Sequence, residues 1–205
     1  MEIGLAVVGA YLLGSISFAI VISKVMALPD PRSYGSKNPG ATNVLRTGKK
    51  AAAVLTLLGD ALKGFVPVLL AVIYLPKAAP YVGVAAFLGH LFPLYHRFQG
   101  GKGVATAAGV LFGFHAGLGL GTLATFAIIV AFFRYVSLAS MIAAVFAVFF
   151  SWLIHLGGAT TLAVAVMAAL LIWRHKENIR RLAAGNESKL GAKKATSTDP
   201  SAASR

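Results

Sequence analysis

The 205-residue chain contains no cysteine and only six acidic residues, and these two absences exclude whole classes of chemistry. Without cysteine there are no disulfides, thiolate nucleophiles or cysteine-ligated metals. With so few carboxylates, a two-carboxylate mechanism or a carboxylate-bound metal has little to use, so we expect neither a metal nor a cofactor. Charged residues make up only 12% of the chain, whereas about a quarter of a soluble domain is charged.

Apolar sequence takes the place of the missing charge. Hydrophobic residues form 58% of the chain, and the mean hydropathy is +0.78. This composition is typical of an integral membrane protein, and we predict an all-α fold because lipid leaves exposed backbone groups without partners. The apolar stretches do not alternate as barrel strands do. Compared with the ~20 residues of a helical crossing, seven of them are candidate spans, of which the third and fourth are short. They are Ile3–Val25, Ala52–Leu75, Tyr81–Tyr95, Val104–Phe114, Leu118–Phe133, Leu138–His155 and Thr160–Trp173.

The basic residues indicate an orientation. Of the 19 Lys and Arg, 17 fall on one set of loops and on the C-terminal segment, Lys77 falls on the opposite side, and Lys63 lies inside a span. Positive residues favour the cytoplasmic side, so we predict the N-terminus outside and the C-terminus in the cytoplasm. The same bias explains the net charge of +13 without nucleic acid as a partner. We expect one membrane domain over residues 1–190, followed by a disordered basic tail over residues 191–205.

Three polar islands interrupt the apolar chain: G-S-K-N-P-G-A-T-N-V-L-R from Gly35, F-Q-G-G-K-G-V-A-T from Phe98, and R-H-K-E-N-I-R-R-L from Arg174. An even number of predicted spans separates each pair of islands, so all three should meet at one membrane face. Glycine-rich backbone exposes amides, and Lys and Arg add positive charge. This combination binds phosphate.

The candidate site residues follow from the islands. Lys102 is the central cation, and the pattern around it is no Walker A motif, because His96 replaces the first glycine and Gly103 replaces the Ser or Thr. His175 and Asn178 are three residues apart and share a helical face. Each island also has a plain structural interpretation: a capped loop, a flexible turn and an interfacial amphipathic helix. The candidates for phosphate binding in the first two islands are Ser36, Asn38, Thr42, Asn43, Arg46, Gly100, Gly101, Gly103 and Thr106.

Charged and polar residues also occur inside two predicted spans. Asp60 and Lys63 are about one helical turn apart, at a depth where charges are expensive and usually paired. Either they neutralise each other, or Lys63 faces the anion site and Asp60 orients it. His90, in the third span, either joins the phosphate site or makes a structural hydrogen bond.

With these motifs the chain resembles the bacterial acyl-phosphate:glycerol-3-phosphate acyltransferases, the PlsY family. The resemblance runs from the first span to about Glu187. It rests on G-S-x-N-P-G-A-T-N-V-L-R, the D-x-x-K-G that begins at Asp60, the G-H that ends at His90, F-x-G-G-K-G-V-A-T, and R-H-x-x-N-I-x-R-L. Lys37 departs from the pattern, where the family more often has glycine.

The resemblance implies an enzyme that moves a fatty acyl group from acyl phosphate to the sn-1 hydroxyl of glycerol 3-phosphate, in the first step of phospholipid synthesis. Lys102, His175, Asn178 and Ser137 would be the catalytic residues, and Lys63 and His90 would join the phosphate-binding set. The partners would be the two substrates, membrane lipid and the upstream enzyme that forms acyl phosphate. The enzyme would lie in the bacterial inner membrane, with its site at the cytoplasmic face.

Two other functions use the same features. A transporter for organic phosphate anions would bind its substrate with the same loops, although the predicted outer half carries almost no charge. A non-catalytic scaffold for anionic lipid headgroups would explain the basic loops, but not the repeated glycines from Gly100 to Gly103.

Overall fold

The computed structural model describes residues 1–191, and these residues form helices and loops without a strand. The predicted disorder of the tail falls outside the described residues, except at Gly191. The elements are α1 (Glu2–Gly14), α2 (Phe18–Val25), α3 (Ala41–Val44), η1 (Leu45–Thr47), α4 (Lys50–Tyr74), α5 (Ala79–Leu91), η2 (Leu94–His96), α6 (Val104–Phe114), α7 (Ala116–Phe133), α8 (Val136–Leu153), α9 (Gly158–Arg174) and α10 (Lys176–Ala183).

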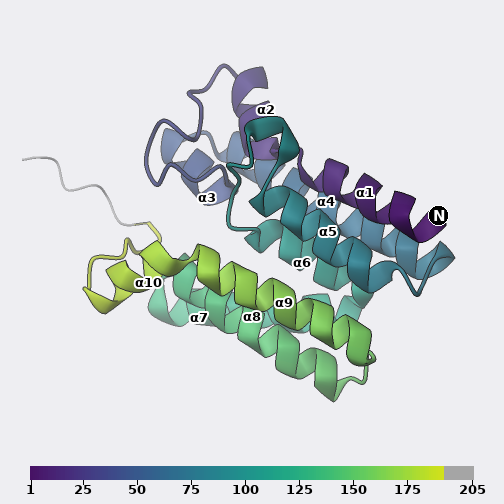
Figure 1. Ribbon diagram of the computed structural model, residues 1–205. Coiled ribbons are helices and arrows are strands. Elements are labelled where there is room, and N and C mark those ends of the chain that lie inside the picture. Colours follow the sequence, from purple (N-terminus) through teal and green to yellow (C-terminus); the bar gives the residue numbers. More distant parts are fainter. Residues whose placement is uncertain (192–205) are drawn as a thin grey trace, which may run out of the picture.

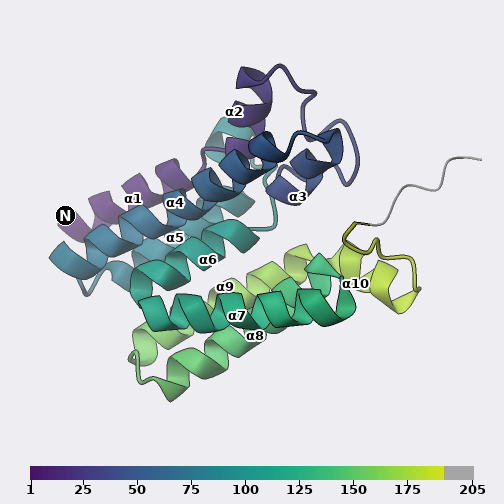
Figure 2. The ribbon, with the colours of Figure 1, turned by 180° about the vertical axis from the view of Figure 1, so that it is seen from behind.

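The long helices run side by side in two groups (Figures 1 and 2). Helices α1, α4, α5 and α6 form one group, and α7, α8 and α9 form the other. Packing of α5 and α6 against α9 joins the two groups. The short elements α2, α3 and α10 lie at one end of the bundle, opposite the N-terminus. This is the end to which the three polar islands belong.

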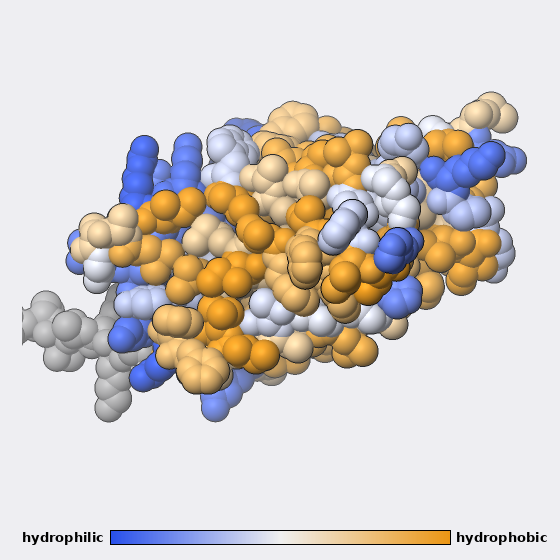
Figure 3. Space-filling view, turned by 90° about the horizontal axis from the view of Figure 1, so that it is seen from below, coloured by the Kyte–Doolittle hydropathy of each residue, from blue (hydrophilic) through white to orange (hydrophobic). Residues whose placement is uncertain are grey.

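Small residues hold the first group together. A Cβ atom on Gly109 of α6 would lie 1.9 Å from the carbonyl oxygen of Ala61 in α4, and one on Gly64 would lie 2.4 Å from the carbonyl of Thr106. Glycines at this crossing therefore let the two backbones touch, which is how helices associate in lipid, where apolar burial alone gives little driving force. Large apolar side chains instead cover the outside, as the predominantly orange surface of Figure 3 shows.

The helical membrane class is confirmed, and each predicted span overlaps a helix, although the third, Tyr81–Tyr95, runs past the end of α5 at Leu91. By length and composition, α4, α7 and α8 each suffice to cross a membrane, and the bent pairs α1–α2 and α9–α10 raise the number to five. Helix α6 is apolar but shorter. The count of seven crossings and the sides of the two termini stay predictions.

The first predicted span, Ile3–Val25, is not one continuous helix. It breaks between Gly14 and Phe18, and α1 and α2 meet at a bend of 44°. The hydroxyl of Ser15 donates to the carbonyl of Tyr11 (2.8 Å), and the amide of Ile16 donates to Leu13. The chain after the break then leads into the first polar island.

Single cysteines test the predicted orientation without background, because the wild type has none. Ser36→Cys and Ser188→Cys should resist an impermeant thiol reagent in intact cells, and Lys77→Cys should react; all three positions are exposed. This expectation rests on the positive-inside rule, because Lys77 falls on the opposite side of the predicted spans from nearly all other Lys and Arg residues. Labelling of Ser188→Cys from outside would reverse the predicted side of the C-terminus.

Candidate active site

The three polar islands are in contact at one end of the bundle. The guanidinium of Arg174, the last residue of α9, donates to the carbonyl oxygens of Gly101 (3.1 Å) and Gly100 (2.8 Å). A Cβ atom on Gly101 would lie 3.1 Å from the carbonyl oxygen of Pro39 in the first island. The three islands therefore meet at one end of the bundle, as the even number of intervening spans predicts, and the Gly100–Gly103 loop contacts both of the others.

Gly101 lies at a closely packed point of that loop. Its amide donates to the carbonyl of His90 (3.2 Å), and a Cβ atom would come within 2.3 Å of Nε2 of the same histidine. No side chain larger than hydrogen fits there unless His90 moves. The sequence indicates glycines for an exposed backbone, and the structure adds this second reason, close approach.

Helix α6 begins directly after the loop. Gly103, with φ +81°, precedes Val104, and the amide of Ala107 donates to the carbonyl of Gly103. Within residues 1–191, the amides of Lys102 to Thr106 have no hydrogen-bond acceptor. Unpaired amides and the positive end of the helix dipole favour an anion at this position.

Lys102 projects from the loop towards α10. Its ammonium donates to the side-chain oxygen of Asn178, and the side chain is partly buried. Burial and, to a smaller extent, the nearby Arg181 lower the pKa of Lys102 to about 8, although Glu187 opposes the shift. Lys102 is thus a cation that a bound anion would stabilise in its charged form.

Glu187 joins the candidate residues, and sequence reasoning missed it. Its Oε1 accepts from Ser137 and from Nδ2 of Asn178, both at 2.6 Å, and its Oε2 accepts from Arg181 at 2.7 Å. Burial alone would raise the pKa of Glu187, but these three hydrogen bonds outweigh it and lower the pKa. Only six residues of the chain are acidic, so the presence of a carboxylate close to the third island was the signal that could have identified Glu187.

The chain after α10 folds back to bring Glu187 into place. Leu190 and Arg134 exchange two hydrogen bonds: the Leu190 amide donates to the Arg134 carbonyl (2.7 Å), and the Arg134 guanidinium donates to the Leu190 carbonyl (2.9 Å). Arg134 lies in the turn between α7 and α8, three residues before Ser137. This anchoring connects Lys102, Asn178, Glu187 and Ser137 in one continuous network.

His175 lies at the bend of 57° between α9 and α10 and is 2% exposed. Its Nδ1 is 2.8 Å from the carbonyl oxygen of Leu171. A carbonyl only accepts, so Nδ1 carries the proton, and Nε2 of the neutral ring is left as an acceptor. The local helix thus fixes the tautomer of His175.

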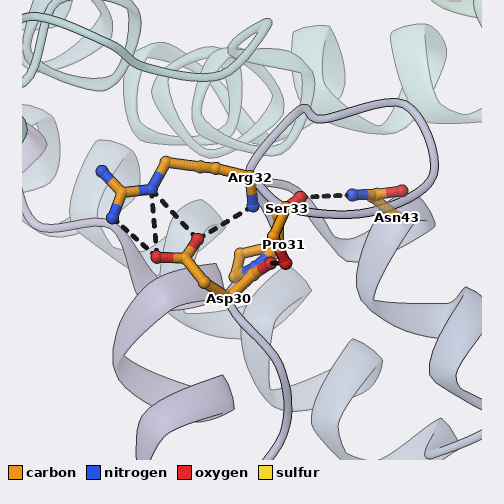
Figure 4. A network of polar contacts seen from close by, with 5 residues as sticks. All are labelled: Asp30, Pro31, Arg32, Ser33 and Asn43. Carbon is orange, nitrogen blue, oxygen red and sulfur yellow. Dashed lines mark hydrogen bonds and ion pairs between the residues drawn. The ribbon is translucent and has the colours of Figure 1, made fainter.

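In the first island, Asn43 supports the loop (Figure 4). Its Nδ2 donates to the carbonyl of Pro31 (2.7 Å), the contact drawn in Figure 4, and to the carbonyl of Tyr34 (3.2 Å). Its Oδ1 accepts from the amide of Ser36 (3.0 Å). Asn43 is 2% exposed, and all its polar atoms are engaged by backbone. Its predicted contact with phosphate is untested, but these bonds give it a role in shaping the loop.

An ion pair steadies the start of the same loop. Figure 4 also shows Asp30 accepting from the Arg32 guanidinium (2.6 Å) and backbone amide (2.9 Å). The hydrogen bond from Arg32 holds the pKa of Asp30 below its usual value. The pair is more than a third exposed, so it contributes little free energy of unfolding.

The other candidates of the first island face outwards. Ser36, Thr42 and Arg46 are exposed, and their side chains make no hydrogen bond to another of residues 1–191. Asn38 is partly buried, and its amide nitrogen lies 3.0 Å from where a Cβ on Gly40 would be. Lys37 has φ +55°, a region that favours glycine. These side chains remain available to a ligand, and their roles stay predictions.

The polar residues predicted inside spans form a buried cluster. The ammonium of Lys63 lies 2.9 Å from Oδ1 of Asp60, which agrees with the first interpretation, that the two charges neutralise each other. The same ammonium donates to the Ile16 carbonyl at 2.5 Å. No pattern in the sequence predicts this last contact. His90 Nδ1 lies 3.2 Å from the hydroxyl of Thr106 and 3.6 Å from Asp60. Phosphate binding by Lys63, His90 and Thr106 stays a prediction.

Known proteins are similar to this chain in both sequence and fold. The sequence model described as glycerol-3-phosphate acyltransferase matches residues 4–185. A relative of that name from Cupriavidus necator is 59% identical over 191 residues, which cover 90% of this chain and 95% of the relative. A crystal structure of PlsY, an integral membrane glycerol 3-phosphate acyltransferase, in its glycerol 3-phosphate form, has a TM-score of 0.90 and 41% identity. The match covers 93% of this chain and 96% of that one. The lysophosphatidic acid form has a TM-score of 0.88 and 40% identity, with the same coverage.

The fold and these matches define the class first: the protein is an acyltransferase built from membrane helices. More narrowly, the chain belongs to the glycerol-3-phosphate acyltransferase family of the PlsY type, as the motifs indicate. It is a multi-pass membrane enzyme of phospholipid biosynthesis. Family membership favours an enzyme over the transporter and the scaffold.

Proposed function

We propose that this protein transfers a fatty acyl group from acyl phosphate to the sn-1 hydroxyl of glycerol 3-phosphate, giving lysophosphatidic acid and inorganic phosphate. The observation that carries the proposal is the contact of Lys102 with Asn178 beside the unpaired amides that begin α6. Both substrates carry phosphate, and this arrangement offers a cation and backbone donors in one place. The family match and the glycerol 3-phosphate form of its solved relative support the acceptor.

The reaction needs positioning more than it needs a protein nucleophile. The substrate hydroxyl forms a C–O bond to the acyl carbon while the bond from that carbon to the phosphate oxygen breaks. Phosphate leaves, and the hydroxyl proton passes to an acceptor. Because acyl phosphate is already activated, holding the two reactants together and stabilising the developing negative charge supply much of the rate.

The side chains divide this work. Lys102 and the unpaired amides from Lys102 to Thr106 bind phosphate, whereas the Gly101 amide, predicted for the same role, already donates to the His90 carbonyl. Ser36, Thr42 and Arg46 are exposed at the first island for the second phosphate. Asn178 and Ser137 both donate to Glu187. They orient the attacking hydroxyl or the carbonyl oxygen, and Glu187 sets their positions.

The proton acceptor in this account is a phosphate oxygen of the substrate. His175 is buried, with Nδ1 held by Leu171, so its remaining nitrogen orients a substrate hydroxyl by accepting a hydrogen bond. Six acidic residues, of which Glu187 already accepts three hydrogen bonds, leave few protein groups for the role of general base.

The proposal includes a location. The site lies at the cytoplasmic face of the bacterial inner membrane, where glycerol 3-phosphate is available and where the basic loops belong by the positive-inside rule. Membrane lipid surrounds the bundle, and the acyl chain enters between helices from the bilayer. The enzyme that forms acyl phosphate is the expected partner upstream, because its product partitions into the same membrane.

A donor comparison tests the proposed function. Purified protein receives labelled glycerol 3-phosphate with acyl phosphate, acyl-CoA or acyl carrier protein in separate reactions, and the product is analysed for the position of its ester. We expect 1-acyl lysophosphatidic acid from acyl phosphate alone. Product from acyl-CoA without any from acyl phosphate would refute the proposed donor, and a 2-acyl product would refute the proposed position. Uptake of glycerol 3-phosphate into liposomes without acylation would favour the transporter.

A further inference from the structure

A buried chain of polar side chains crosses the first helix group and ends at the glycine-rich loop. Asp60 and Lys63 of α4, His90 of α5 and Thr106 of α6 are 2%, 3%, 7% and 0% exposed, respectively. Ionisable groups among membrane helices are costly and are retained where they serve a purpose. In the proposed function phosphate binds at the loop, and these residues lie one layer below it.

At one end, this row of polar side chains contacts the break in the first span, between α1 and α2. The ammonium of Lys63 donates to the carbonyl of Ile16, midway between the end of α1 and the start of α2. A carbonyl at such a break has lost its helical partner and needs a donor. Lys63 supplies that donor, and Asp60, at 2.9 Å, balances its charge. The ammonium of Lys63 is thereby engaged before any phosphate arrives.

At its other end, the row of polar side chains contacts Gly101. The imidazole of His90 has Nδ1 beside Asp60 and Thr106, while its Nε2 occupies the space that a Cβ on Gly101 would need. The backbone of His90 adds the hydrogen bond that its carbonyl accepts from the Gly101 amide. Thus His90 supports the loop from inside the bundle, while Arg174 holds the Gly100 and Gly101 carbonyls from the side of α9.

We propose that Asp60, Lys63 and His90 are positioning residues that fix the backbone of the Gly100–Gly103 loop at Gly101 and connect it to the break between α1 and α2. In this proposal they orient the loop without touching phosphate, which replaces the phosphate contact that the sequence predicts for Lys63 and His90. The consequence for binding rests on the proposed function, whereas the consequence for the loop does not. A loop that loses this support samples other backbone conformations, and its donors no longer converge on an anion.

The first test removes the two charges together. Asp60→Asn with Lys63→Met avoids a lone buried charge, which would destabilise the fold for reasons unrelated to the loop. In the full-length protein we expect hydrogen exchange of the loop, measured at the Gly101 amide that donates to His90, to rise at least tenfold. The Kd values for glycerol 3-phosphate and inorganic phosphate should rise about tenfold, as should KM, with a smaller change in kcat.

Thr122→Val provides the matched control, since Thr122 is a buried hydroxyl of α7 that donates only within its own helix. It should leave loop exchange and phosphate binding unchanged. Wild-type loop exchange and wild-type Kd values in a folded Asp60→Asn, Lys63→Met protein would overturn the proposal. The ion pair would then contribute only to the stability of the fold. Loop exchange does not depend on the acyl donor, so failure of the proposed function would show separately as absence of lysophosphatidic acid.

A double-mutant cycle tests whether His90 acts at Gly101, and it is needed if the Asp60→Asn, Lys63→Met variant does not fold. Gly101→Ala alone places a methyl group against the His90 ring, and we expect a loss of at least tenfold in phosphate affinity. His90→Ala removes that ring, so adding Gly101→Ala to it should cost less than threefold more. Equal losses from Gly101→Ala in both backgrounds would show that His90 does not act at Gly101.

Discussion

Lys102→Ala should reduce kcat/KM for acyl transfer about a hundredfold while the protein stays folded. Lys102 extends from a loop and not from a packed helix, so its removal creates no cavity and little change in the free energy of unfolding. The catalytic loss follows from a charge-assisted contact in a partly buried site, which is worth about 3 kcal/mol of transition-state stabilisation. Steady-state kinetics on purified protein, with a thermal unfolding curve alongside, measure both quantities.

Lys176→Ala is the matched control for this prediction. Lys176 is an exposed cation at the start of α10, two residues before the asparagine that Lys102 contacts. Its removal changes the net charge equally but should leave kcat/KM within about twofold, since exposed charges are screened. A folded Lys102→Ala enzyme with near wild-type activity would remove this side chain from the mechanism.

Asn178→Ala should be as severe, with a loss of at least about a hundredfold in kcat. The amide of Asn178 accepts from Lys102 and donates to Glu187, so it is the only described residue that bridges these two charged groups. Removing one preorganised donor from a catalytic site typically costs ~2.7–4 kcal/mol of transition-state stabilisation. Measured kcat and KM for glycerol 3-phosphate test this.

Two further variants interpret that result. Asn178→Asp keeps an acceptor for Lys102 but cannot donate to Glu187, so it should remain severely impaired if the donor matters. Asn186→Ala removes an exposed amide from the segment after α10 and should change little. Asn178→Ala activity within about threefold of wild type would contradict the network as the centre of the site.

Much of the fold could be predicted because lipid imposes simple rules. Apolar length located the helices within a few residues, as in Val104–Phe114, which the structure reproduces. Parity of the spans placed the islands at one end, and the contact between Arg174 and Gly101 confirms that they meet. These predictions need only local composition and counting.

Features that depend on distant contacts could not be predicted. The break near Ile16 lies at Gly14 to Ser17 inside a stretch long enough to be one span, and the donor to its carbonyl is Lys63, 47 residues further along the chain. Glu187 reaches Ser137 only because the segment after α10 folds back onto Arg134. Asn43 was predicted from its type to bind phosphate, yet backbone groups up to 12 residues away engage its amide. In each case the partner is set by tertiary packing, which local sequence does not encode.

The central claim is that this site positions its substrates and uses no protein base. The dependence of kcat/KM on pH for wild type and His175→Gln tests it most directly, because glutamine still accepts a hydrogen bond but does not titrate. Wild type should lose activity as pH rises through about 8, where Lys102 gives up its charge. His175→Gln should keep measurable activity and the same acidic limb as wild type, since that limb belongs to substrate phosphate. An acidic limb that is present in wild type and absent from His175→Gln would identify His175 as the general base and contradict the account.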